Sequence, residues 1–210
     1  AANALYHLAV VAGLSATVVH VYRVEPSGGG VGWGQPVVTQ LSNLTAPWGW
    51  KAHDASLAAR HATDTSGLPA ALFVGTPYDE KCGPTADWAA TCAYVGGVHV
   101  FTLVASVWVW SGTLKPPVVK QVAKCGASVA IAGDLVAVGC YADTSASTLV
   151  DVGEGDATGS QVGSAHVWRL DGANASTSVR EGYLKAFTAA DGHYLGVSTA
   201  VAVNATHEVV

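Results

Sequence analysis

The segment GSAHVWRL, Gly163–Leu170, occurs three times in this chain in related form. GGVHVFTL occupies Gly96–Leu103, and TVVHVYRV occupies Thr17–Val24. Each copy joins a histidine, a valine, an aromatic residue, one variable position and an aliphatic residue. Alternate side chains of a β-strand share a face, so the histidine, the aromatic and the aliphatic residue of each copy lie together. The three segments therefore predict equivalent strands in a repeating β-architecture.

Further matches extend the repeat on both sides of these segments. GTLK at Gly112–Lys115 corresponds to GYLK at Gly182–Lys185, 70 residues later. LFVGTPYD at Leu72–Asp79 corresponds to VAVGCYAD at Val136–Asp143. Repeat lengths of this size are typical of solenoids, propellers and arrays.

One complete unit contains four short apolar segments separated by turn residues. They are residues 127–133, 135–140, 164–170 and 179–187, and a tight turn at Gly133-Asp134 joins the first two. Four antiparallel strands linked in this way would make one blade of a β-propeller. Since one sheet cannot bury both of its faces, neighbouring blades are expected to supply the core.

Short motifs recur in a fixed order within these units. Leu195-Gly196 and Cys125-Gly126 open a unit, Ser128–Ala130 follows, and Val74–Pro77 and Gly163–Trp168 come later. In this order they resemble the FG-GAP repeat of integrin-α-type β-propellers, with His166 where that family usually has tyrosine.

The resemblance covers nearly the whole chain and implies an all-β fold. It predicts a single FG-GAP-like β-propeller fragment over residues 1–210, with about three four-stranded antiparallel blades. The blade periods would be 7–69, 70–134 and 135–206, followed by the start of the next strand. Three blades cannot close a ring, so we expect a segment of a larger propeller of about seven blades.

Many blades of this family bind calcium through a D-x-D-x-D-G loop, which this chain lacks. The corresponding places hold Ala132–Asp134, Val203–Thr206 and Arg60–Pro69. A calcium ion needs six or more oxygen ligands, usually including several carboxylates, so we expect no metal and no cofactor. The acidic segment Asp151–Gly159, with Asp151, Glu154 and Asp156, stays open as an alternative cation site.

The four cysteines form two close pairs along the chain, Cys82 with Cys92 and Cys125 with Cys140. Neither spacing is that of a zinc site, and no histidine stands at ligand spacing beside them. We expect two local disulfides, each stabilising the fold by roughly 2–3 kcal/mol. After the turn at Gly133-Asp134 a regular hairpin would pair Cys125 with position 142, so the second disulfide requires a β-bulge.

Three of the four asparagines open a glycosylation sequon: Asn43, Asn174 and Asn204. Sequons together with paired cysteines are typical of a glycosylating and oxidising secretory route. The sequence therefore predicts an N-glycosylated protein at an extracellular or cell-surface location.

The repeated histidines, His20, His99 and His166, occupy equivalent strands of different units. Equivalent strands point their side chains in equivalent directions and do not bring them together. We therefore expect each histidine to pack between sheets with one hydrogen bond, and not to share a metal site.

The composition excludes some classes of partner. The net charge is −5 and no run of basic residues is present, which argues against nucleic acid and anionic membrane surfaces. The apolar run Leu8–Val19 is too short to span a bilayer, so no membrane insertion is expected in this segment.

No nucleophile elbow and no carboxylate pair indicates catalysis. Trp48, Trp50 and Trp88 lie in expected loops, where they would be available to a ligand. We therefore expect a non-catalytic adhesion, matrix or recognition module for other extracellular proteins or glycans. The alternatives are a structural subunit of an extracellular filament or coat, formed by self-association, and a propeller-based polysaccharide lyase or hydrolase.

Overall fold

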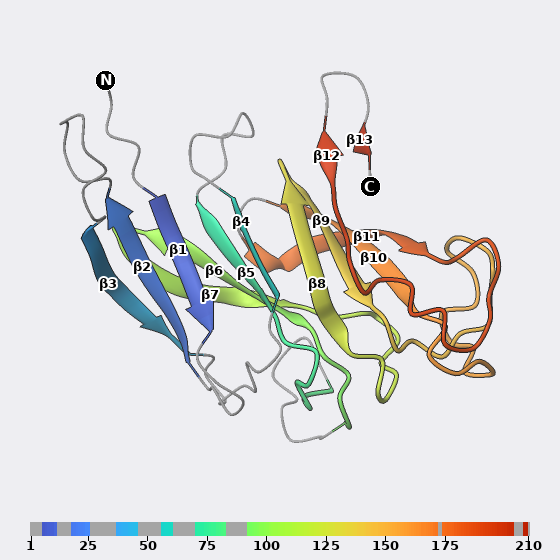
Figure 1. Cartoon of the computed structure of the whole chain (residues 1–210). Coiled ribbons are helices and arrows are strands. Elements are labelled where there is room, and N and C mark those ends of the chain that lie inside the picture. Colours follow the sequence, from blue (N-terminus) through green and yellow to red (C-terminus); the bar gives the residue numbers. More distant parts are fainter. Residues whose placement is uncertain are drawn as a thin grey trace, which may run out of the picture.

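The computed structural model shows an all-β chain (Figure 1). The structure describes residues 6–11, 18–25, 37–45, 56–60, 70–82, 92–171, 174–203 and 208–209. No helix occurs in these ranges, and so none there has the length and apolar character that a membrane crossing requires. The prediction of an all-β fold is confirmed.

The described strands form three antiparallel sheets and a short pair of strands. The first sheet has the order β1 (Tyr6–Val11), β2 (Val19–Glu25), β3 (Val37–Leu44). The second has the order β4 (Ser56–Arg60), β5 (Ala71–Gly75), β6 (Val98–Val104), β7 (Val107–Leu114). The third consists of β8 (Cys125–Ala132), β9 (Leu135–Cys140), β10 (Ser164–Asp171) and β11 (Asn174–Leu184), again in chain order. The short pair is β12 (Ala202–Val203) with β13 (Glu208–Val209).

Each copy of the repeated histidine segment lies on an inner strand. These strands are β2, β6 and β10, each paired with a neighbour on both sides. Their alternating pattern therefore indicated strand type and position correctly. The second and third sheets each begin one strand before the periods expected to start at residues 70 and 135, because β4 and β8 pair with the strands that follow them.

The β8–β9 hairpin has the expected two-residue turn and the expected irregularity. Ala132 faces Leu135 across the turn, and Gly133 adopts a left-handed φ of 58°. The register then shifts between Cys125 and Ser128, so that Cys125 faces Cys140. The bulge required by the sequence argument is present.

The same hydrogen bond, from a serine side chain to a glycine carbonyl, joins the first strand of the second and third sheets to the repeat that follows. The Ser56 hydroxyl donates to the carbonyl oxygen of Gly126 at 2.9 Å, and the Ser128 hydroxyl donates to that of Gly196 at 2.8 Å. A Cβ on Gly139 would lie 1.8 Å from the Gly196 oxygen, so a larger residue does not fit there. The glycine of the repeated Val-Gly motif is thus explained by close approach of a backbone carbonyl from the following repeat.

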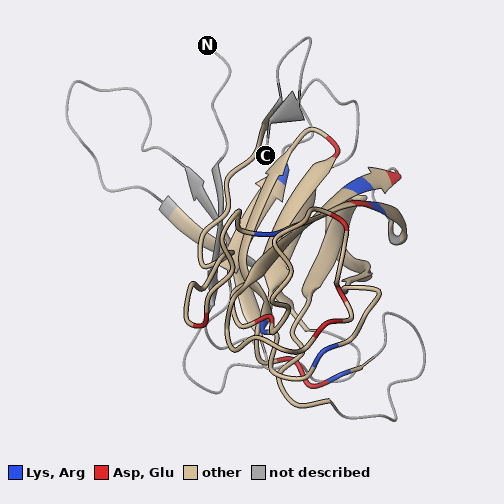
Figure 2. Cartoon of the chain, turned by 90° about the vertical axis from the view of Figure 1, so that its right-hand side faces the viewer, with Lys and Arg blue, Asp and Glu red and all other residues tan. Residues whose placement is uncertain are grey.

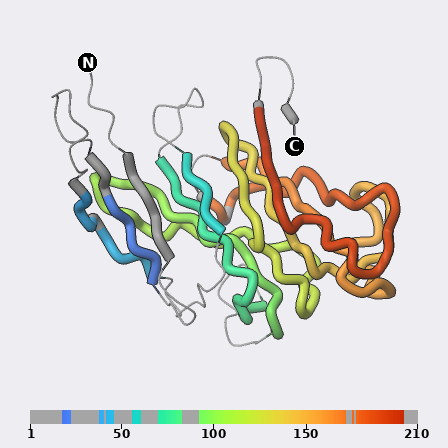
Figure 3. The backbone as a smooth tube through the Cα atoms, in the orientation of Figure 1, coloured from blue at the N-terminus to red at the C-terminus, as the bar shows by residue number. Residues whose placement is uncertain are grey.

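Apolar side chains fill the spaces between the sheets. Val19 and Val21 of the first sheet pack with Val74 and Phe101 of the second. A second cluster joins the second and third sheets; it contains Phe73, Val98, Val100, Val136, Val138, Trp168 and Leu170. Trp168 is therefore a packing residue, as expected. The described sheets stand side by side in an open row (Figure 3).

Charged side chains are sparse on the strands. Figure 2 shows that they lie mainly in the loops and at strand ends. A few of these charged groups, near the ends of β5–β7 and β9–β11, are buried, and they define the candidate site.

Candidate functional site

Asp79, His99 and Lys115 meet inside the second sheet. Asp79 follows β5, His99 is in β6 and Lys115 follows β7. The Lys115 ammonium lies 3.1 Å from Asp79 Oδ2, and His99 Nε2 lies 3.6 Å from the same oxygen. Thr113 Oγ1 is 2.9 Å from His99 Nδ1, and Lys115 also donates to the carbonyl oxygen of Gly96 at 2.8 Å. We call this group the Asp79 cluster.

Burial and charge act in opposite directions in the Asp79 cluster. Burial alone would raise the pKa of Asp79, but His99 and Lys115 outweigh it and lower the pKa to about 2. Burial lowers the pKa of His99 and the pKa of Lys115, and Asp79 opposes both shifts. The carboxylate and the ammonium therefore compensate each other inside the sheet.

The third sheet has an equivalent group, the Asp143 cluster. Asp143 Oδ1 accepts a hydrogen bond from Lys120 at 2.7 Å, and its Oδ2 accepts one from the Tyr183 hydroxyl at 2.7 Å. The Lys185 ammonium donates to the carbonyl oxygens of Ser145 and Gly163. His166 lies beside Tyr183, with ring centroids 5.0 Å apart.

Environment again sets the protonation of these groups. Burial would raise the pKa of Asp143, but the hydrogen bonds from Lys120 and Tyr183 lower it. Burial lowers the pKa of His166 to about 3, against the attraction of Asp143. Burial also raises the pKa of Tyr183 and lowers that of Lys185.

These clusters explain why distant motifs repeat together. The aspartate after the Val-Gly motif, the histidine of the His-Val segment and the lysine of the Leu-Lys segment converge in each of these two sheets. His99 and His166 nevertheless stay in separate sheets, as expected, while His20 bonds Asn43 Oδ1 at 2.7 Å within the first sheet. Sequence reasoning had recognised the three motifs as repeat landmarks but had not predicted their contact.

Both expected disulfides are present. Cys82 is joined to Cys92, and Cys125 to Cys140. Two intramolecular disulfides suggest an oxidising, extracellular type of environment.

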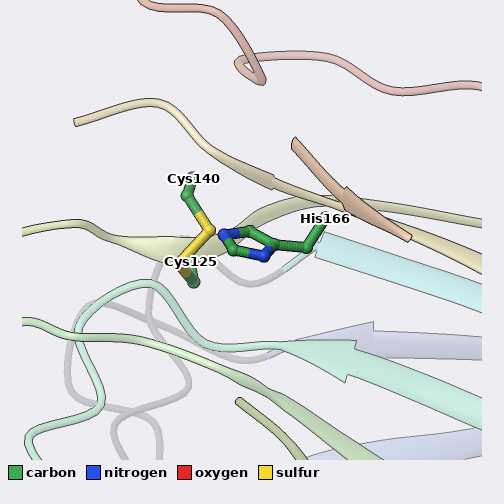
Figure 4. Close-up of side chains that lie close together, drawn as sticks. All are labelled: Cys125, Cys140 and His166. Carbon is green, nitrogen blue, oxygen red and sulfur yellow. A yellow bond between two sulfur atoms is a disulfide. The ribbon is translucent and has the colours of Figure 1, made fainter. Parts of the chain in front are cut away.

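His166 lies against the second disulfide. One ligand atom from each of Cys125, Cys140 and His166 lies within 4.8 Å of the others, and all three residues are buried (Figure 4). No histidine stands at ligand spacing beside the cysteines in the sequence, but the fold brings His166 next to the second pair. The histidine comes from β10, which is paired with β9, the strand of Cys140.

A small cavity opens beside these three residues. Its lining residues are Pro116, Val118, Lys120, Ala123, Cys125, Cys140, Asp143, Glu154 and His166. The cavity has a volume of about 10 Å³, which approaches the volume that one water molecule needs. Two buried atoms at this cavity have no hydrogen-bond partner, His166 Nδ1 and Glu154 Oε1, which lie 3.9 Å apart.

The acidic segment Asp151–Gly159 does not gather its carboxylates into one site. Asp151 accepts the backbone N–H of Tyr183 at 2.6 Å, and Asp156 accepts that of Ala146 at 2.8 Å. Glu154 instead pairs with Arg180 at 3.1 Å, and burial raises its pKa despite that charge. The three carboxylates serve separate contacts, so the alternative cation site loses its basis.

The other predicted residues are only partly covered by the described chain. Asn43 is exposed in β3, and Asn174 lies in β11 without a described side chain. Asn204 and the loop tryptophans Trp48, Trp50 and Trp88 lie outside the described residues. Glycosylation at the three sequons stays a prediction.

A row of four tyrosines and one lysine runs along the loops at one end of the strands of the second and third sheets. It consists of Tyr94, Tyr78, Lys124, Tyr141 and Tyr194, which we call the tyrosine row. Tyr78 and Tyr94 meet edge to face with centroids 5.5 Å apart, and Tyr141 and Tyr194 lie 6.1 Å apart. The Lys124 ammonium joins the two pairs, at 5.2 Å from the Tyr78 ring and 5.1 Å from the Tyr141 ring.

The two ends of the tyrosine row are open to solvent. Tyr94 is 39% exposed and Tyr194 is 42% exposed. A hydrogen bond with Tyr141, with a smaller contribution from Tyr78, raises the pKa of Lys124. Sequence reasoning missed this surface because its members have no common spacing and come from several loops.

No protein-family model matches the chain, and no curated protein is similar to it at the threshold searched.

Proposed function

We propose that this chain is an extracellular, non-catalytic recognition module built from FG-GAP-like β-propeller blades. The repeated sheet-to-sheet contact supports the blade interpretation, because Ser56 with Gly126 and Ser128 with Gly196 use the same atoms at successive joints. The two disulfides support the extracellular location.

The buried charged groups favour a structural role over a catalytic one. Lys115 and Lys185 donate to backbone carbonyls of the loops between strands, and Asp143 accepts from Lys120 and Tyr183. Groups engaged in this way fix loops at the sheet edge. The lyase or hydrolase alternative gains no support from them, since their carboxylates are already paired.

The tyrosine row is the observation that carries the recognition proposal. Tyrosines present large, rigid and amphipathic surfaces at low conformational cost, which makes them frequent anchors of binding interfaces. Tyr94 and Tyr194 are held by their ring neighbours but keep about two-fifths of their surface exposed. Extracellular proteins or glycans would bind along this row.

The test removes the two exposed rings together. Tyr94 and Tyr194 both adopt left-handed φ values, 49° and 52°, so Tyr94→Asn with Tyr194→Asn keeps a residue type that tolerates this conformation. Binding would be measured on a glycan array and on immobilised extracellular-matrix proteins. We expect at least tenfold weaker binding for the double variant.

Val107→Ser with Val179→Ser is the matched control, since both valines are exposed on the outer strands β7 and β11, away from the tyrosine row. The control should bind like the unmodified chain. A wild-type chain that binds neither surface, or a double variant that binds undiminished, would count against the proposal.

The outer strands favour a second candidate, the filament or coat subunit. Val107, Val109 and Val179 are exposed on β7 and β11, each at the edge of its described sheet. Exposed apolar edge strands can pair with another chain. Sedimentation that shows a concentration-dependent assembly, lost in Val107→Lys with Val179→Lys, would favour this candidate over the first.

A further inference from the structure

We propose that Cys125, Cys140 and His166 form a zinc site in the reduced chain, with Glu154 as the carboxylate that orients the histidine. The proposal is independent of the recognition function. It rests on the position of a buried histidine and of a carboxylate oxygen without a hydrogen-bond partner, Glu154 Oε1, beside the only two cysteines that the described chain brings next to a histidine.

The three ligand atoms already lie close enough for a common ion. They are within 4.8 Å of one another, and Figure 4 shows a ring nitrogen of His166 directed at the sulfur atoms. Zinc binds thiolate sulfur at about 2.3 Å and imidazole nitrogen at about 2.0 Å, so tetrahedral ligands stand about 3–4 Å apart. Side-chain rotation after the disulfide opens would separate the sulfurs to this spacing.

The surroundings offer what a ligating histidine normally needs. His166 is 2% exposed, and its Nδ1 has no hydrogen-bond partner. Glu154 Oε1 lies 3.9 Å from that nitrogen and is likewise unpartnered, while Arg180 holds the other carboxylate oxygen at 3.1 Å. A carboxylate behind a ligating imidazole fixes the ring and strengthens its bond to the metal.

The cavity supplies room for the ion's remaining position. Its volume of about 10 Å³ approaches the space for one water molecule, and it borders all three ligands. Three protein ligands and one water would complete a four-coordinate zinc. The soft thiolates favour zinc over calcium or magnesium, which prefer oxygen ligands.

The conversion balances with a dithiol as the reductant. The dithiol transfers two electrons and two protons, the Cys125–Cys140 bond breaks to give two thiols, and the dithiol becomes a disulfide. Zinc then replaces the two thiol protons, which leave to solvent. Without the metal two buried thiols would stay neutral, and with it the two thiolate charges are compensated.

Cobalt(II) is the probe, because its thiolate complexes absorb in the near ultraviolet by sulfur-to-metal charge transfer. The chain would be reduced with dithiothreitol, freed of reductant under argon and titrated with Co²⁺, then with Zn²⁺ in competition. We expect one Co²⁺ per reduced chain with the charge-transfer band, displacement by Zn²⁺, and no band for the oxidised chain.

Variants assign the ligands. Cys125→Ala and His166→Gln should each weaken Co²⁺ binding at least 100-fold. Glu154→Gln should weaken it 10- to 100-fold while keeping the charge-transfer band, as expected for a residue that positions a ligand. Cys82→Ala with Cys92→Ala is the matched control and should bind like the unmodified chain.

Two results would overturn the proposal: a reduced, folded chain that binds no Co²⁺, or a band that persists in Cys125→Ala. Far-ultraviolet circular dichroism would accompany every sample. If the reduced chain unfolds, Zn²⁺ should restore the β-sheet spectrum of the control variant but not of Cys125→Ala. Failure to restore it would also overturn the proposal.

Discussion

The Asp79 and Asp143 clusters occupy equivalent places in neighbouring sheets, but their buried carboxylates have different partners. In the second sheet Lys115 contacts Asp79 directly at 3.1 Å, and Thr113 satisfies His99 at 2.9 Å. In the third sheet Tyr183 and Lys120 donate hydrogen bonds to the Asp143 carboxylate, and Lys185 donates to two backbone carbonyls.

The difference shows which part of the repeat is fixed. The aspartate, histidine and lysine are kept in both sheets, whereas the residues beside the histidine change. Where Cys140 follows Gly139, Thr76 follows Gly75 and hydrogen-bonds the Gly97 carbonyl oxygen at 3.3 Å. The second sheet therefore surrounds its histidine with hydrogen-bonding groups, and the third has a disulfide, a cavity and an unpartnered carboxylate oxygen of Glu154 there.

Removing each aspartate charge gives the largest expected difference. Asp79→Asn leaves the buried Lys115 ammonium without its counter-charge, so we expect about 3–5 kcal/mol of lost stability. Asp143→Asn should lose less, because Asn keeps a partner for Tyr183 and Lys185 also donates to two backbone carbonyls. The Lys120 side chain is 10% exposed, whereas that of Lys115 is fully buried. Urea unfolding measures both, and equal losses would contradict the distinction between the clusters.

The disulfides should rank next. Cys125→Ala with Cys140→Ala opens a loop with a sequence separation of 15, for which the chain-entropy model gives about 3 kcal/mol. The same change at Cys82 and Cys92, separated by 10, should lose slightly less. Thermal unfolding of the two double variants compares them, and a much greater loss at Cys82 would show that the third sheet does not depend on its own bridge.

Per pH unit, the acid response of His166 is smaller than the loss expected from removing either disulfide. Its folded pKa of about 3 lies below the ordinary histidine value of 6.5, so the unfolded chain binds more protons between these values. Stability should therefore fall as the pH drops from about 6.5 towards about 3, by up to about 1.4 kcal/mol per pH unit from this group.

His166→Gln should flatten that slope, while His99 keeps its own contribution because burial lowers its pKa as well. Below about pH 4 the loss from Asp79 adds to it, because that carboxyl has a folded pKa of about 2. Urea unfolding across this range provides the measurement. An unchanged slope in His166→Gln would show that the ring is accessible to protons in the folded chain.

Local patterns predicted local structure well. Alternation placed β2, β6 and β10, the Gly133-Asp134 dipeptide placed a turn, and the cysteine spacing required the bulge that the structure contains. Each of these depends on residues near one another in the sequence. They could be read without knowing how the sheets pack.

The contacts between distant segments could not be read in that way. Asp143, His166 and Lys185 belong to a loop, a strand and another strand end, and only the pairing of β10 with β9 on one side and β11 on the other brings them together. The position of His166 beside Cys140 has the same origin. The tyrosine row draws on four loops, so no periodicity marks it.

The serine-to-glycine contact at each joint has a consequence for how such a chain can lengthen. In both four-stranded units the first strand carries a serine hydroxyl, and the backbone oxygen that accepts its hydrogen bond lies in the following repeat. The pairs are Ser56 with Gly126 and Ser128 with Gly196. A duplicated unit would thus arrive with both halves of its coupling. The array can grow or shrink by whole units without any new interface having to evolve.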